Sequence, residues 1–192
     1  AAVIVTTAYS QSEFKAVLDI PENGSVLADA VSVSTDYTAS AVAVLAPSAG
    51  GADLNGIALK VNVGVANADS RGEAAITGAG TLDAASVAVT GRGIAASSVY
   101  NVSPVASLSA VTIAANVLVA LLDAENLAYI QGVEVENAAV TVNARLNAAD
   151  GQGASALLAN NIKGSGVSVS LASARSNTAV ALNRSVNKAF MD

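Results

Sequence analysis

The chain has 192 residues, of which 53% are apolar, 3% aromatic and 12% charged, and its net charge is −6. This acidic balance, with few Lys and Arg, argues against a nucleic-acid partner and against a polybasic membrane-surface site. Because the chain contains no Cys and no His, it cannot form disulfides, a thiolate nucleophile, a His-based triad or a zinc site with Cys or His ligands.

The apolar content comes mainly from small side chains, Ala and Val, and the mean hydropathy is +0.53. Such side chains cannot fill a wide globular interior, whereas Val-rich strands suit thin layers in which backbones approach closely. The longest apolar run, Leu108 to Leu122, is shorter than the ~20 residues that a spanning helix needs, so we expect no membrane span.

Residues 1–25 fit no repeat, and the first recurring pattern begins at residue 26. Ala30-Val31-Ser32-Val33 is a Val-x-Val segment, and an Ala-alternating stretch follows it from Thr38 to Ala46. We interpret residues 26–53 as a partial copy of a repeated unit.

The unit is complete in residues 54–107. Apolar residues alternate from Ile57 to Ala66, and a period of two is typical of a β-strand. The predicted segments are strands 57–66, 73–77, 86–90 and 94–102, with a polar turn at 67–72 and Gly78 after the second strand.

The pattern recurs at a fixed offset, which identifies residues 108–165 as a further copy and 166–192 as a partial one. Further turns are predicted at Asp123–Asn126 and Arg175–Asn177. The aligned pairs include Val63 with Val117, Val65 with Val119, Asp69 with Asp123, Ile76 with Ile130 and Gly78 with Gly132. Residues 1–192 are therefore predicted to form a single repetitive β segment.

Two segments also have helical character. Residues 107–130 are rich in Ala and Leu, which favour a helix by propensity, and residues 153–163 could form a short helix. The copy that starts at Ile57 carries Val-Asn-Val-Gly-Val, which disfavours a helix. Because two copies of one unit should share a fold, we predict strand for 107–130.

The predicted fold class is all-β, with a β-solenoid or β-helix-like stack as its architecture. A single unit buries little, whereas stacked units would bury a continuous core of Val and Ala. The alternative is a stack of antiparallel β-hairpins or a sandwich, because the predicted turns are short enough to be hairpin loops.

Eight valines on the alternating strands are predicted to face a shared core. They are Val63, Val65, Val87, Val89, Val117, Val119, Val140 and Val142. On this prediction Val117→Asp would bury an unpaired charge and destabilise the fold by several kcal/mol, whereas the same change at Ala114, on the opposite face, would be milder.

The repeated motifs resemble those of a known protein family. They stand here as Val61-Asn62-Val63, Ala75-Ile76-Thr77-Gly78 and Ser86-Val87-Ala88-Val89, and they recur as Ala115-Asn116-Val117, Ala128-Tyr129-Ile130-Gln131-Gly132 and Thr141-Val142. The pattern is similar to the repeats of very large leukotoxin-type filamentous adhesins and covers most of residues 26–183. The resemblance implies a fibrous protein displayed on a bacterial surface, and it supplies no binding residue.

Paired carboxylates are the candidates for catalysis, because two acids can perform glycoside hydrolysis. The pairs are Asp69 with Glu73, Asp123 with Glu125, and Glu134 with Glu136. We favour turn chemistry for the two aspartates and a solvated strand face for Glu134 and Glu136.

Ligand motifs are incomplete. Asp150-Gly151-Gln152-Gly153 resembles half of a glycine-rich calcium turn, but one Asp supplies too few oxygen ligands. Neither Gly50-Gly51 nor Gly91-Arg92-Gly93 is followed by the Lys-Ser/Thr of a phosphate loop, so we predict tight turns there.

Two sets of polar side chains remain. Asn62 and Asn116 occupy equivalent positions, where they form either a hydrogen-bonded amide ladder or an outward polar row. The tyrosines are the aromatic candidates for binding sugar, but their spread along the chain disfavours one shared site; they are Tyr9, Tyr37, Tyr100 and Tyr129.

We therefore expect a structural or adhesive repeat segment of a large bacterial cell-surface or secreted fibrous protein, with no enzymatic activity, cofactor or metal. Its expected partners are neighbouring repeats or identical subunits, with a host surface or a glycan as a further partner. One alternative is a self-assembling extracellular filament subunit. The other, a carbohydrate-active β-helix, is disfavoured because the basic residues are scattered rather than gathered in a groove.

Overall fold

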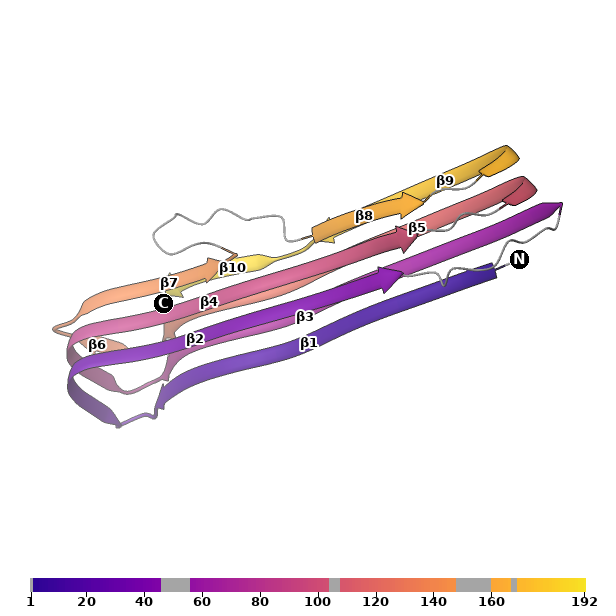
Figure 1. The fold of residues 1–192 in the computed structure, drawn as a ribbon. Helices are drawn as coiled ribbons and strands as arrows, with labels where there is room; N and C mark the ends of the chain where they lie inside the picture. The colour runs from indigo at the N-terminus through magenta and orange to yellow at the C-terminus, as the bar shows by residue number, and fades with distance from the viewer. Residues whose placement is uncertain (1, 46–55, 104–107, 148–159, 167–168) are drawn as a thin grey trace.

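The computed structural model describes residues 2–45, 56–103, 108–147, 160–166 and 169–192 (Figure 1). These residues form strands and no helix, which confirms the all-β prediction and excludes a helix at 108–130. The strands are β1 Ala2–Ile20, β2 Ser25–Leu45, β3 Ile57–Gly78, β4 Thr81–Ser103, β5 Leu108–Gln131, β6 Glu134–Glu136, β7 Ala139–Leu146, β8 Asn160–Gly166, β9 Val169–Asn183 and β10 Val186–Met191. None of the described residues belongs to a helix able to cross a membrane.

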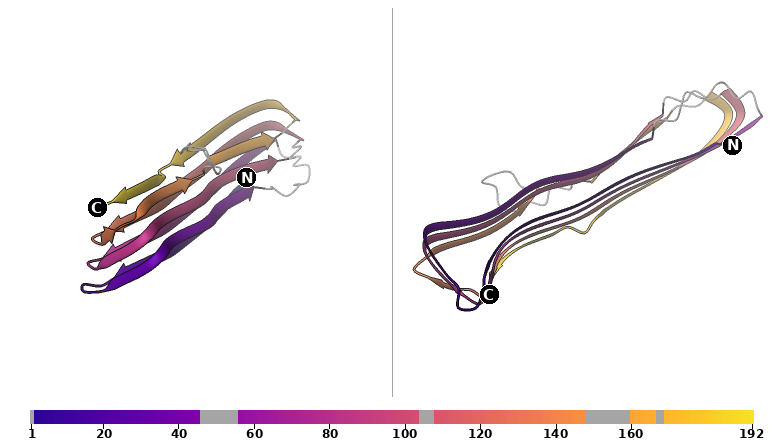
Figure 2. Two further views of the ribbon diagram at one scale, coloured as in Figure 1. Left: turned by 90° about the vertical axis from the view of Figure 1, so that its left-hand side faces the viewer. Right: turned by 90° about the horizontal axis from the view of Figure 1, so that it is seen from below.

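The strands form two five-stranded sheets. In the first sheet the order is β1-β3-β5-β10, and β9 also pairs with β5; in the second it is β2-β4-β6, and β7 and β8 also pair with β4. Figure 2 shows the sheets as two layers that run side by side along the length of the molecule. The chain thus passes from one sheet to the other and returns one strand further on.

Every strand pairing in the described residues is parallel. A hairpin joins antiparallel neighbours, whereas parallel neighbours need a long crossover. Here the crossover for one sheet is a strand of the other sheet. The strands therefore do not form the antiparallel hairpin stack that the sequence left open.

The register between β3 and β5 joins the residues that the repeat alignment pairs. Val63 lies opposite Val117, and Asp69 lies opposite Asp123. Residues 2–20, which fit no repeat in the sequence, form β1 and pair with β3 from Ala2 opposite Lys60 to Ile20 opposite Gly78. Backbone pairing therefore continues where the sequence pattern does not.

The predicted turns at Asn67–Gly72, Asp123–Asn126 and Arg175–Asn177 are wrong, because these residues lie inside β3, β5 and β9. Their polar side chains lie on both faces of continuous strands, because Asp69 and Asp123 point outward whereas Ser70 and Asn126 are buried. The glycines Gly91 and Gly93 likewise lie within β4, not in a turn.

The chain turns where the backbone leaves the ordinary β region. Asn23 has φ 66° and Gly78 has φ +127°. The Gly24 N–H donates to the Pro21 carbonyl at 2.8 Å, and the Thr81 N–H donates to the Gly24 carbonyl at 3.0 Å, which stacks one turn on the next.

Two clusters of buried side chains fill the space between the sheets. The first contains Tyr37, Leu45, Val99 and Leu122 among many alanines, and the second contains Ile20, Ile76, Leu82, Val89 and Ile130. Because the alanines are small, the two sheets approach closely and the core is thin.

The prediction that Val63, Val65, Val117 and Val119 face the core is wrong. The buried residues of these strands are the alternate ones, such as Ala66, Leu118 and Ala120. Gly64 also faces inward, because a Cβ built on it would lie 2.2 Å from Leu45 Cδ1 and 2.7 Å from Val99 Cγ1. Both faces of β3 and β5 are apolar, so alternation alone did not identify the inner one.

The same prediction holds better in the second sheet. Val87 and Val89 are 1% and 0% exposed, which confirms them as core residues. Val142 is partly buried and packs against the second core cluster, whereas Val140 is 37% exposed. Val140 lies on β7, which pairs only with β4 among the described strands.

Candidate functional site

Amide side chains join two neighbouring strands of the first sheet, β3 and β5. The Asn62 Nδ2 donates to Asn116 Oδ1 at 2.8 Å, across the β3–β5 register. This confirms the amide ladder and excludes the outward row, because Asn62 shares its face of β3 with the inward-facing Gly64. A side-chain bond between equivalent positions stabilises one register, because a one-residue slip would move the amides to opposite faces.

A tyrosine lies inside the molecule between the sheets. Tyr37 is 3% exposed, its ring stacks on Phe14 with centroids 5.2 Å apart, and its hydroxyl donates to the Glu125 carbonyl at 3.1 Å. Burial raises the pKa of Tyr37, and the charge of Glu125 raises it further. This position rules Tyr37 out as a platform for sugar.

Glycines provide the space for that ring. A Cβ on Gly72 would lie 2.2 Å from Tyr37 Cε1, and a Cβ on Gly93 would lie 2.5 Å from the Tyr37 hydroxyl oxygen. Gly93, which was predicted to lie in a tight turn, therefore provides space for a buried aromatic ring.

A buried amide connects the two sheets beside the tyrosine. Asn126 is 0% exposed, and its Nδ2 lies 3.1 Å from the carbonyls of Gly91 and Arg145 and 3.0 Å from Asn187 Oδ1. Asn187 Nδ2 in turn donates to the Ala144 carbonyl at 3.0 Å. A buried amide is tolerated only when it is hydrogen-bonded, so these contacts fix the relative position of β4, β5, β7 and β10.

A charged cluster lies on the outer face of the first sheet. Glu73 is 5% exposed; its carboxylate lies 3.2 Å from Lys15 Nζ and accepts a hydrogen bond of 2.6 Å from the Tyr129 hydroxyl. Arg71 lies 3.9 Å from Glu73 and 3.4 Å from Glu125. The groups come from β1, β3 and β5, so the cluster joins three strands.

These contacts set the protonation of the cluster. Desolvation raises the pKa of Glu73, but the hydrogen bonds from Tyr129 and Lys15, with the charges of Lys15 and Arg71, outweigh it and leave this pKa below its usual value. The hydrogen bond to Glu73 raises the pKa of Tyr129, whose ring stacks on Phe190 at 5.0 Å. Glu73 is therefore an ionised, paired carboxylate and is poorly suited to act as a general acid.

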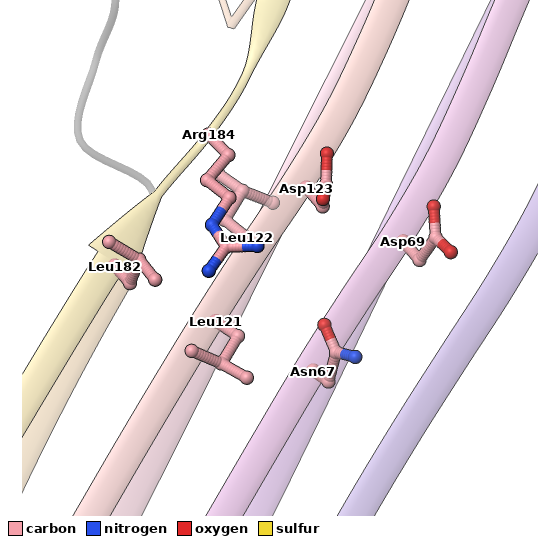
Figure 3. Close-up of a pocket in the computed structure, with 7 residues that line it drawn as sticks. All are labelled: Asn67, Asp69, Leu121, Leu122, Asp123, Leu182 and Arg184. Atoms are coloured by element: carbon pink, nitrogen blue, oxygen red, sulfur yellow. The ribbon is translucent and has the colours of Figure 1, made fainter.

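The aspartates of the predicted acid pairs meet across strands rather than along them. Asp69 lies opposite Asp123, and with Arg184 they line a hollow on the outer face (Figure 3). The other lining residues are Asn67, Leu121, Leu122 and Leu182. Within the described part of the chain, no group of three or more acidic residues could hold a metal.

The remaining candidates do not form a shared site. Glu134 and Glu136 are exposed on β6, and Val135 between them packs against the second core cluster, as expected for a solvated strand face. Tyr9 is 62% exposed on β1, whereas Tyr129 is partly buried on β5. The calcium-like segment 150–153 and Gly50-Gly51 lie outside the described residues.

The two ends of the sheets carry strands with one free edge. Among the described strands, β1 pairs only with β3 and β2 only with β4, and the two edge strands contain 19 and 21 residues. At the other end, β9 and β10 pair only with β5 (Figure 2). Each edge presents backbone N–H and C=O groups that a further parallel strand can bind. These edges, with the in-register rows between them, are the candidate functional surface.

No protein-family profile, curated protein or solved structure compared with this chain matches it.

Proposed function

We propose that this chain is a segment of β-solenoid repeats from a large bacterial cell-surface or secreted fibrous protein, with a structural or adhesive role and no catalysis. The observation that supports it most is the in-register parallel pairing of equivalent residues, such as Asn62 with Asn116 and Asp69 with Asp123.

The path of the chain supports the proposed solenoid architecture. Each circuit contributes one long strand to each sheet, as β1 with β2 and β3 with β4 do, and the next circuit pairs in parallel with the last. Such a unit contacts chiefly its neighbours, so additional circuits extend the same core without changing it.

The proposal of a non-catalytic role rests on how the polar groups are used. Glu73 of β3 pairs with Lys15 of β1, Arg71 of β3 pairs with Glu125 of β5, and Asn126 binds carbonyls between the sheets. These contacts hold strands in register. The surface location rests on the resemblance to filamentous adhesins and on a composition without Cys, which suits export.

Adhesion by such a segment would depend on the number of copies that bind at the same time. Each circuit offers few polar groups to a host surface or glycan, so single-site affinity would be weak and many copies would bind together. The test compares beads that carry one copy or three tandem copies of the chain, at equal bead loading, for binding to host cells. We expect binding to increase about 100-fold for the tandem form. Equal binding would contradict the adhesive role.

A second candidate, a self-assembling extracellular filament subunit, is favoured by the free edges at both ends of the sheets. The sequence of the gene that flanks the segment distinguishes the two. Further copies on both sides support one long chain, and separate short reading frames support a subunit.

A further inference from the structure

The outer face of the first sheet is apolar over several rows. We define the apolar face as a set of outward residues of β1, β3, β5 and β9. They lie on the side of the aspartates Asp69 and Asp123 that is away from the charged cluster. They are Val3, Val5, Thr7 and Tyr9; Ile57, Leu59, Val61, Val63, Val65 and Asn67; Ile113, Ala115, Val117, Val119 and Leu121; and Ala174, Ser176, Thr178, Val180 and Leu182. Thr7, Asn67, Ser176 and Thr178 are polar, and none of the set is charged.

Much of this face is open to solvent. Val3, Val5 and Ile57 are 69%, 62% and 69% exposed, and Leu59, Ile113 and Val180 are each 44% exposed. Charged residues begin only in the next row, at Asp69 and Asp123. Contiguous exposed apolar surface of this extent marks an interaction site.

The outer face of the second sheet is different. Its outward residues on β2 and β4 include Val42, Val44 and Ile94, but hydroxyl and charged side chains separate them. The polar members are Ser32, Ser34, Asp36, Thr38, Ser40, Thr90 and Arg92. The apolar composition is thus specific to one side of the molecule.

We infer that the apolar face packs against the apolar face of a second copy of this chain. Four strands about 4.8 Å apart and about 11 residues of about 3.3 Å each give roughly 700 Å² per copy. Two copies would bury about 1,400 Å², which lies within the range of stable protein–protein interfaces, ~1,200–2,000 Å². Sheets pack face to face through such rows of branched side chains.

Charge favours a second copy over a lipid surface. A face without charge can meet itself without like-charge repulsion, whereas the net charge of −6 opposes an anionic membrane. Lateral pairing does not require that repeats continue along the stacking axis, so it is independent of the proposed function.

The test is sedimentation equilibrium of the 192-residue chain and of two double variants. Val65→Lys with Val117→Lys places two charges on the apolar face. Thr90→Lys with Ser32→Lys, the matched control, places two charges on the outer face of the second sheet. We expect the wild type and the control to form dimers at micromolar concentration, and the face variant to dissociate at least 100-fold more readily, with the far-ultraviolet spectrum of all three unchanged.

Three results would overturn the inference. The first is a wild type that stays monomeric at 100 times the micromolar concentration. The second is equal dimerisation of the face variant and the control variant. The third is a wild-type monomer that floats with phosphatidylcholine vesicles, with this binding lost in the face variant. Equal dimerisation would assign association to the strand edges, and flotation would assign the face to lipid.

A second measurement covers the case in which the face variant fails to fold. The chain has no Cys, so Val117→Cys and Thr90→Cys each introduce one labelling site. With pyrene attached, we expect excimer emission from the Val117 label and none from the Thr90 label. Excimer emission of equal strength at both sites would also contradict face-to-face pairing.

Discussion

At the scale of single residues, the interior combines a few large groups with the small residues that make room for them. Tyr37 lies over Gly72 and Gly93, and Asn126 lies against Gly91. These glycines have no side chain to contribute, so their value lies in the close approach that they permit. Substituting them therefore affects the neighbouring ring or amide more than the strand itself.

Gly72→Ala should destabilise the fold by about 1–3 kcal/mol, because its Cβ would overlap the Tyr37 ring in a packed core. Gly56→Ala is the matched control, since nothing lies within 4 Å of a Cβ at that position. Urea denaturation measures both. Equal midpoints for the two variants would show that the ring moves aside without cost.

The lowered pKa of Glu73 links stability to pH. A carboxyl whose pKa is lower in the folded state contributes stability at neutral pH, and this contribution is lost as pH falls from about 4.5 through the folded pKa. Glu73→Gln should cost about 1–3 kcal/mol at pH 7 and less at pH 3. Glu136→Gln, at an exposed position of β6, is the control. If Glu73→Gln costs the same at both pH values, the ion pair does not stabilise the fold.

At the scale of elements, β3 and β5 have two apolar faces with different functions. The inner face carries mainly Gly, Ala and Leu residues that pack against the second sheet, and the outer face carries valines in rows across the strands. Branched side chains stabilise neighbouring strands by lateral contact even when one side faces solvent. Within one chain, the valines therefore support pairing along the first sheet rather than packing against the second sheet.

The two faces of β5 should differ strongly in their tolerance of a charged substitution. Leu118 is 5% exposed, so Leu118→Asp should destabilise by about 3 kcal/mol or more because it buries an unpaired charge. Val117→Asp should cost about 1 kcal/mol or less, from lost strand preference. Chemical denaturation at submicromolar concentration keeps association from contributing. If Val117→Asp destabilises the fold more than Leu118→Asp does, Val117 rather than Leu118 faces the core.

At the scale of the whole molecule, stability should be greatest in the middle of the stack. β3 and β4 have partners on both sides, whereas β1, β2 and β10 each pair on one side only among the described strands. All six residues of β10 are exposed. Edge strands therefore have fewer contacts to lose when they open.

Hydrogen exchange measures this gradient. We expect backbone amides of β3 and β4 to exchange at least tenfold more slowly than those of β10, because local opening of an edge strand costs less free energy than opening of a central strand. Uniform exchange rates along the chain would mean that the stack opens only as a whole. The spread of exchange rates among the amides of one strand provides the internal control for differences between strands.

The sequence by itself determined the all-β class and, given parallel pairing, the register. Alternation predicts strands, and the recurrence of Asn62 at Asn116 and of Asp69 at Asp123 identifies the residues that pair, because each residue of a parallel ladder meets its equivalent. The contacts of the candidate site could be predicted only in part. The recurrence of Asn at positions 62 and 116 indicated the amide ladder, whereas no pattern indicated the buried contacts of Tyr37 and Asn126.

The tertiary structure alone decided which face is inside and where the chain turns. Gly64 faces inward because Leu45 and Val99 of the opposite sheet fill the space beside it, and no local pattern records what another sheet brings. Asn67–Gly72 resembles a turn in composition, but strands on both sides satisfy its backbone and keep it extended. Residues 2–20 join the stack through the same backbone bonds, which do not depend on side-chain identity.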